Sequence, residues 1–312
     1  MCFEGMQLLH DMEISQNVFG NLSRIKSTRN NTIILKEKTK MATKDKIQPA
    51  TPVAIQSNVP AYLRRAPGQR PAGFQNMDRS DWTLPRLGLC QSNSPQRSEG
   101  DAKHVEGLKD GQFFNSITQT VYGKSVKIVP LMFFKSRIRF RAMDEGGGIL
   151  CRSDDGKTGI GDPGGNCEKC LMSQFSQGEN KNTVPPECDH FYNYAVLVIP
   201  PDGEPLGPDS LAVMSLKSTG LKTAREFNAL LRLKNTDFFA GVYEVSSAVQ
   251  KNQAKQSWFT HVIKSAGWVS EAQLTIAKAV YESVSQAHTE GRLKVDAEDI
   301  AADGRQPGDE DL

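Results

Sequence analysis

Residues 126–134, Val-Lys-Ile-Val-Pro-Leu-Met-Phe-Phe, run directly into residues 135–141, Lys-Ser-Arg-Ile-Arg-Phe-Arg. The first stretch predicts a buried strand because it is almost continuously apolar. The second alternates strictly, which is typical of a strand with one face in water. Successive side chains of a strand point to opposite faces, so the basic residues form one row and the apolar residues line the other face. The basic row is Lys135, Arg137, Arg139 and Arg141, and the apolar set is Phe134, Ile138 and Phe140.

Further strands follow from similar patterns. Residues 191–199 form the clearest strand pattern of the chain, and residues 211–216 predict a short strand after a Pro/Gly turn. Residues 241–249 and 257–263 predict a hairpin around a polar turn.

Two helices are predicted among these strands. Thr223-x-x-Glu226 is a capping-box pattern that opens the first helix, and Ser270 caps the last one. Strands dominate, with one helix between them and one after. This order favours a mainly β (α+β) fold with a small β-barrel over a parallel sheet with crossover helices.

The first forty residues differ from the rest. They show no convincing period, and Met41 opens a polar stretch of the kind that begins many bacterial proteins. Lys36-Glu37 can be encoded by a sequence that contains a ribosome-binding core. We hypothesise that residues 1–40 are a translated leader that is absent from the native protein. The alternative is a genuine N-terminal extension.

Composition suggests how the remaining chain is divided. A length of 312 residues fits one large domain or two modest ones. Residues 41–85 are rich in Pro, Ala, Gln, Ser and Arg and predict a flexible arm. Residues 86–290 predict the folded core, with a cysteine loop at 144–190, and residues 291–312 predict an acidic disordered tail.

Charge is distributed unevenly. Residues 295–312 carry seven acidic side chains and one basic side chain, so the remainder of a chain with net charge +2 carries +8. A basic body with an acidic end is typical of nucleic-acid-binding proteins. The alternative is a solubilising tail on an ordinary domain.

The same composition bears on compartment. No apolar run approaches the ~20 residues that a membrane span needs, and the start lacks the pattern of a secretory signal. Six cysteines are too sparse for a disulfide scaffold, which favours a reducing cytoplasm.

Four of the six cysteines are clustered. Cys151, Cys167, Cys170 and Cys188 fall within 38 residues, with spacings of 15, 2 and 17. A tetrahedral zinc site needs two thiolates from one tight turn, which Cys167-x-x-Cys170 offers, and two from elsewhere. The sequence predicts a closed, structural Zn²⁺ site. A redox Cys-x-x-Cys pair and unrelated core cysteines are the alternatives, and His190 is a possible substitute ligand.

Patterns for catalysis are missing. Gly156-Lys157-Thr158 fails as a phosphate loop, because Cys151 stands where the first glycine is required. We find no nucleophile elbow, no paired-histidine metal motif and no recurring carboxylate pattern. We therefore expect a protein that is not an enzyme.

The basic strand is the strongest indication of function. Residues 112–143 contain six basic and no acidic side chains, and a row of cations at about 6.6–7 Å spacing suits a phosphate backbone. Outward-facing aromatics would stack on unpaired bases. The alternative is an ordinary solvated strand face, with most aromatics in the core. The predicted DNA-binding residues are Lys124, Lys127, Lys135, Arg137, Arg139, Arg141, Tyr192, Tyr194, Lys217, Lys222 and Trp258.

About residues 85–312 resemble the phage-type single-stranded DNA-binding proteins that carry a zinc knuckle in an oligonucleotide-binding (OB) barrel. The resemblance rests on residues 111–137, on the four-cysteine loop, on residues 217–222, on Gly241-Val-Tyr243 with Ala266-Gly-Trp268, and on the acidic end. The cysteine spacing departs from the pattern in which histidine often serves as a ligand.

The resemblance implies an OB-like barrel with an inserted zinc loop, and sequence-independent binding of single-stranded DNA in replication, recombination or repair. We expect a cytoplasmic protein, in the bacterial host cytoplasm if the chain is phage-encoded. The tail residues Asp309, Glu310, Asp311 and Leu312 would compete for the DNA groove and recruit replication or recombination proteins. The competing hypothesis is a zinc-ribbon transcription or protein-interaction module, which would accept duplex DNA at least as well.

Overall fold

The computed structural model describes most of the chain from residue 83 onward. The described residues are 72–73, 76, 83–142, 145–178, 183–200, 206, 210–252, 255–291 and 293. All of them lie in Pro52–Leu312, one of the two units into which the chain divides. The predicted leader 1–40, nearly all of the arm 41–85 and nearly all of the tail 291–312 lie outside the described residues.

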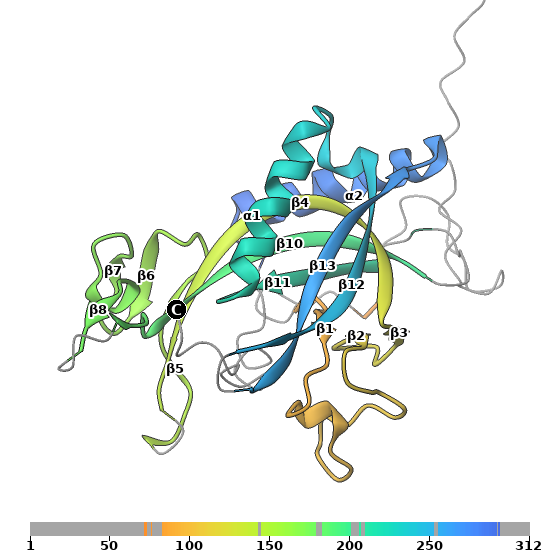
Figure 1. Ribbon diagram of the computed structural model, residues 1–312. Helices are drawn as coiled ribbons and strands as arrows, with labels where there is room; N and C mark the ends of the chain where they lie inside the picture. The colour runs from red at the N-terminus through yellow and green to blue at the C-terminus, as the bar shows by residue number, and fades with distance from the viewer. Residues whose placement is uncertain are drawn as a thin grey trace, which may run out of the picture. The chain divides into compact units, whose positions relative to one another are not determined.

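Among the described residues, antiparallel strands make up most of the regular structure, and two α-helices accompany them (Figure 1). The strands are β1 (Leu87–Leu89), β2 (Phe113–Asn115), β3 (Val121–Gly123), β4 (Ser125–Phe140), β5 (Ile149–Ser153), β6 (Thr158–Gly161), β7 (Gly165–Asn166), β8 (Ser176–Gln177), β9 (Thr183–Val184), β10 (Cys188–Ile199), β11 (Leu211–Leu216), β12 (Gly241–Lys251) and β13 (Ser257–Trp268). The helices are α1 (Gly220–Leu233) and α2 (Glu271–Thr289), with short 3-10 turns at Pro95–Arg97, Leu171–Ser173 and Phe238–Ala240. The prediction of a mainly β chain with one helix between strands and one after them is confirmed.

β4 is the strand around which the sheet is built. The pairings give the order β11-β10-β4-β12-β13, and β4 also pairs with β5 at its far end. β4 spans 16 residues and is strongly curved in Figure 1. Pro130 has no N–H to donate, and the ladder with β10 shifts register beside it, between Ala195 and Val196. The long apolar and alternating stretch therefore forms one strand with a bulge near its middle.

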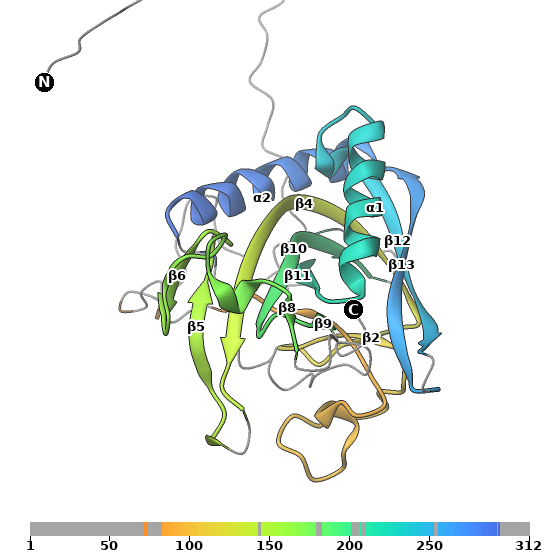
Figure 2. The same ribbon diagram turned by 60° about the vertical axis from the view of Figure 1, so that its left-hand side comes forward.

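The sheet buries apolar side chains on both faces. Ile128 lies in a cluster that α1 completes with Phe227. Leu197 lies in a second cluster, on the other face, that α2 completes with Ala277 and Val284. Figure 2 shows α2 lying along the curved back of β4. The two helices thus cover different parts of the same sheet.

The helix starts were predicted with different success. α1 begins at Gly220 with Thr219 as N-cap, so the capping box predicted at Thr223 is wrong. The Thr223 hydroxyl donates instead to the carbonyl of His261 on β13, at 3.4 Å. For α2 the prediction is confirmed, since Ser270 caps the helix and Gln273 completes a capping box.

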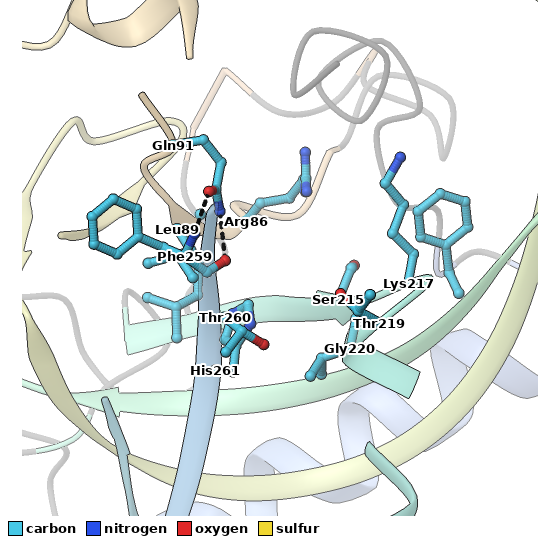
Figure 3. A pocket seen from close by; sticks show the side chains of 14 residues that line it. Arg86, Leu89, Gln91, Ser215, Lys217, Thr219, Gly220, Phe259, Thr260 and His261 are labelled. Atoms are coloured by element: carbon cyan, nitrogen blue, oxygen red, sulfur yellow. Dashed lines mark hydrogen bonds between the residues drawn. The ribbon is translucent and has the colours of Figure 1, made fainter. Parts of the chain in front are cut away.

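The sheet has a seam between β11 and β13, because no described backbone ladder joins these two strands. The segment around β1 occupies the seam. Arg86 forms a parallel bridge with Val213 of β11. On the other side, the Gln91 side chain donates to the Phe259 carbonyl at 2.9 Å and accepts from the Phe259 N–H at 2.8 Å (Figure 3). A side-chain amide thus takes the place of a strand partner for β13.

Residues 145–178 and 183–187 form a small lobe, which we call the cysteine lobe. The sequence predicted a loop here, but β5, β6 and β7 extend the sheet from the end of β4, and β8 pairs with β9. Figures 1 and 2 show this lobe at one end of the β4–β10 pair. The short strands lack the apolar alternation that would have revealed them in the sequence.

Candidate nucleic-acid interface and cysteine site

Three residues of the basic row, Lys135, Arg137 and Arg139, lie on one face of β4, as predicted. Phe134 and Ile138 are buried in the cluster under α2, on the opposite face. In the ladder with β10, Lys135 lies opposite Tyr192, and Arg137 lies opposite His190. The row face therefore carries cations from one strand beside rings from the next.

The cations of the row differ in what they contact. Lys135 is exposed, and its Nζ lies 5.1 Å from the centre of the Tyr192 ring. Arg137 is partly buried, and its Nε has no hydrogen-bond partner among the described residues. Arg139 is held by Glu187, with 2.8 Å between Nη2 and Oε2, and this hydrogen bond raises the pKa of the guanidinium. Lys135 and Arg137 thus have charge to offer a ligand, whereas Arg139 is engaged in an ion pair.

His190 shows how positive this face is. Burial, together with the nearby charges of Arg137, Lys135 and Arg225, lowers the pKa of His190 to about 4. Arg225 comes from α1, where it is exposed and lies one turn from the exposed Lys222. Helix α1 therefore adds cations to the face that carries the basic row. The His190 imidazole is neutral at pH 7.

Two of the three predicted stacking aromatics are corrected. Tyr194 is fully buried, and its hydroxyl donates to the Ala224 carbonyl at 3.0 Å and lies 2.9 Å from Asn228 Oδ1. Trp258 is only 7% exposed. Neither ring has a free face for a base. Tyr192 keeps partial exposure beside Lys135 and remains suited to stacking.

The lysines at the start of β4 are not part of this face. The bulge at Pro130 reverses the alternation, so Lys127 lies on the same side as Val129, in line with Ile199 and beside Glu244. Eight residues of strand separate it from Lys135, roughly 26 Å. Lys124 lies further still along the chain, so these two predicted DNA-binding lysines lie away from the basic row.

Lys217 and Arg141 were also predicted to contact DNA in one groove, and the structure places them differently from Lys135 and Arg137. Lys217 pairs with Asp189 at 3.3 Å and lies over the Phe191 ring, which faces away from Tyr192. Arg141 is exposed just beyond the end of β4. The four tail residues 309–312 lie outside the described residues.

Trp268 is an exposed aromatic residue that the sequence reasoning did not assign to a site. Trp268 is 60% exposed, and Lys234 lies 4.2 Å from its ring centre and 4.5 Å from that of Tyr243. A tryptophan at a strand end looks like a core residue in the sequence, so only the exposure reveals it.

The structure brings the four clustered cysteines together. All four line one small cavity, together with Arg139 and Ser173. Cys151 of β5 and Cys188 of β10 lie on the two sides of β4, and both are in register with Arg139. The sequence separation of these two cysteines is thus removed by the pairing of the strands.

The Cys-x-x-Cys turn is fixed by its neighbours. The Ser173 hydroxyl lies 2.6 Å from the Cys167 carbonyl and 2.8 Å from the Cys170 carbonyl. A Cβ at Gly159 would lie 2.9 Å from the Cys151 sulfur. The glycine therefore leaves room for a thiol that points toward the turn.

None of the described cysteines takes part in a disulfide. Burial and the neighbouring cysteines raise the pKa of Cys188 to about 11, against the opposing charge of Arg137. Within the described ranges, no three His, Cys, Asp or Glu side chains stand in an arrangement that holds a metal ion. The sulfurs share a cavity without meeting at one point, so the zinc site remains a prediction.

The strands, the row and the cysteine cavity define a mainly β protein with an inserted cysteine lobe. The chain belongs to the family described as Pam3 phage gp34-like protein, which matches residues 52–290. No curated protein and no solved structure matches the chain. In the described part of the chain, neither helix has the length and apolar character to cross a membrane. The family is that of a phage protein, and its name carries no biochemical activity.

Proposed function

We propose that this protein binds single-stranded DNA without regard to sequence, in the replication, recombination or repair of phage DNA. The observation that carries the proposal is the face that joins Lys135 and Arg137 to the partly exposed ring of Tyr192. Cations neutralise phosphates, and a ring stacks on any unpaired base. Arg225 of α1 adds charge to the same face.

The strand order supports an OB-type fold. Five strands in the order β11-β10-β4-β12-β13, with α1 between β11 and β12, match the five-stranded, partly open Greek-key arrangement. Along the chain these strands are β4, β10, β11, β12 and β13. In an OB-fold the second and third strands and the loops after the first and fourth strands bind oligonucleotides. Here these parts are β10, β11, the cysteine lobe and the turn that follows Lys251.

We propose in addition that Cys151, Cys167, Cys170 and Cys188 hold a structural Zn²⁺. Four thiols lining one cavity are the donor set of a closed zinc site, which supplies folding energy and no catalytic position. Arg139 lies in the cavity wall and offsets the negative charge of thiolates. The same residue belongs to the basic row, so the ion would fix the lobe beside the DNA-binding face.

The acidic tail fits this assignment as a competitor. A segment of net charge −6 is attracted to the basic face when DNA is absent. The same segment is released to recruit replication or recombination proteins when DNA occupies the face.

Two variants of β4 test the proposed face. Lys135→Glu places a negative charge in the row, whereas Lys127→Glu makes the same change on the opposite face of the same strand. We expect the affinity for fluorescently labelled poly-dT to fall at least about tenfold in Lys135→Glu and to change less than about twofold in Lys127→Glu. Equal effects would contradict the placement. Duplex binding as tight as single-strand binding would favour a transcription or protein-interaction module.

A further inference from the structure

Two buried nitrogen atoms on the row face have no hydrogen-bond partner within the described ranges. They are Nε of Arg137 and Nε2 of His190. The two residues lie directly opposite each other on β4 and β10, so their side chains share one face. A buried polar atom without a partner costs roughly 1–3 kcal/mol, and folded proteins leave few of them. Two on neighbouring strands indicate a ligand that accepts hydrogen bonds.

The charges around this pair indicate an anion. Arg137, Lys135 and Arg225 are the groups whose charges act on His190, and all three are cations. Arg139, the next cation of the row, is already held by Glu187. Nε2 of an imidazole donates a hydrogen bond when it carries a proton, which an anionic oxygen at this position favours. The pair thus offers two donors in a positive environment.

An aromatic ring adjoins the same pair. The rings of His190 and Tyr192 are 5.1 Å apart between centroids, at an interplanar angle of 76°. Lys135 lies against the Tyr192 ring, at 5.1 Å from its centre. A phosphate at the Arg137–His190 pair would therefore have the Tyr192 ring at the next cross-strand pair on the same face, two residues along the strands.

We propose that Arg137 and His190 form a defined seat for one phosphodiester of the bound strand, with the neighbouring base against Tyr192. The inference rests on the proposed function and names where on the face the backbone is fixed. It distinguishes a seated phosphate from a diffuse attraction to the whole basic row.

Binding measurements test the seat. Arg137→Gln removes one charged contact, so we expect the affinity for labelled poly-dT to fall about 10- to 100-fold and the log–log salt slope to lose about 0.7. His190→Phe keeps the ring against Tyr192 but removes Nε2. We expect about a fivefold loss, because one hydrogen-bond donor to the phosphate is removed. Lys127→Gln, on the opposite face, is the control and should leave both quantities unchanged.

NMR of the histidine rings gives a second readout. The His190 resonances, assigned with the His190→Phe protein, should move when a dT oligonucleotide or tripolyphosphate is added, whereas those of His104 should not. If poly-dT binds but Arg137→Gln keeps the wild-type slope and His190 does not move, the seat is wrong and the proposed function stands. If tripolyphosphate moves His190 and no DNA binds, the seat stands and the proposed function is wrong. No response to either ligand would overturn both.

Discussion

Replacing Cys170 with serine removes one of the four thiols that line the cavity of the cysteine lobe. We expect the wild-type protein to contain one Zn²⁺ per chain and Cys170→Ser to lose it. The matched control is Cys90→Ser, because Cys90 is a fully buried cysteine outside the lobe, with its thiol directed to the Gln91 carbonyl. This control should keep the ion.

The expected effect of losing zinc is large because the cysteine lobe buries few apolar side chains. Among the described residues of the lobe, Cys167 is the one buried hydrophobic side chain, and Ile160, Leu171 and Phe175 are 79%, 76% and 56% exposed. Ordering a backbone costs about 1–2 kcal/mol per residue, and a buried large apolar side chain returns about 1.5–3 kcal/mol. The lobe gains little free energy from buried apolar side chains, whereas a structural zinc ion supplies on the order of 10 kcal/mol of folding free energy.

Zinc content and amide exchange measure this prediction. Chelation or Cys170→Ser should release the amides of the lobe to exchange and leave those of β12 and α1 protected. Cys90→Ser should leave the lobe protected. A zinc-free wild-type protein whose lobe amides are protected, and whose melting ignores chelators, would refute the reasoning.

Three other predictions follow from the described contacts. Tyr192→Ala should weaken single-strand binding by about 1–3 kcal/mol. Tyr194→Phe removes a buried hydroxyl and should lower only thermal stability. Equal losses of affinity in a binding titration would count against stacking by Tyr192. Burial lowers the pKa of His261 to about 4 in the folded chain, so its contribution to stability is complete above the unfolded value near 6.5. This contribution to the free energy of unfolding is lost as the pH falls toward 4, by at most about 3 kcal/mol. His261→Phe should flatten the pH dependence of the free energy of unfolding between pH 6.5 and 4. An unaltered pH dependence would contradict the low pKa of His261. Deleting residues 295–312 should tighten DNA binding most at low salt, and weaker or unchanged affinity would argue against tail competition.

Local pattern was sufficient for much of the fold. The strict alternation from Lys135 to Arg141 fixed which side chains meet the core, and Phe134 and Ile138 are buried as predicted. The Ser270 cap was equally local, because a capping box involves residues within one turn. Such features depend on neighbours in the sequence, so the sequence predicts them.

Features that depend on distant partners were not predictable. The bulge at Pro130 turned Lys127 to the face opposite Lys135. The two lysines are an even number of residues apart, so a regular strand would have placed them on the same face. Tyr192 and Tyr194 share a face, but α1 covers only the second, through Ala224 and Asn228. A strand pattern shows which residues share a face and leaves open how far a helix covers it.

The seam and the cysteine cavity show the same contrast. Gln91 pairs with Phe259, 168 residues away in the sequence, and a lone glutamine gives no indication of such a contact. The grouping of the four cysteines was predicted from their spacing, but the role of β4 between Cys151 and Cys188 needed the strand register.

The most direct test of the account compares single-stranded and duplex DNA. Labelled dT and mixed-sequence oligonucleotides and a duplex of equal length would be titrated with the full chain at several salt concentrations. We predict similar affinity for both single strands, much weaker binding to the duplex, and a log–log salt slope of about −0.7 per phosphate contact. Equal or tighter binding to the duplex, or affinity that ignores salt, would contradict the central claim.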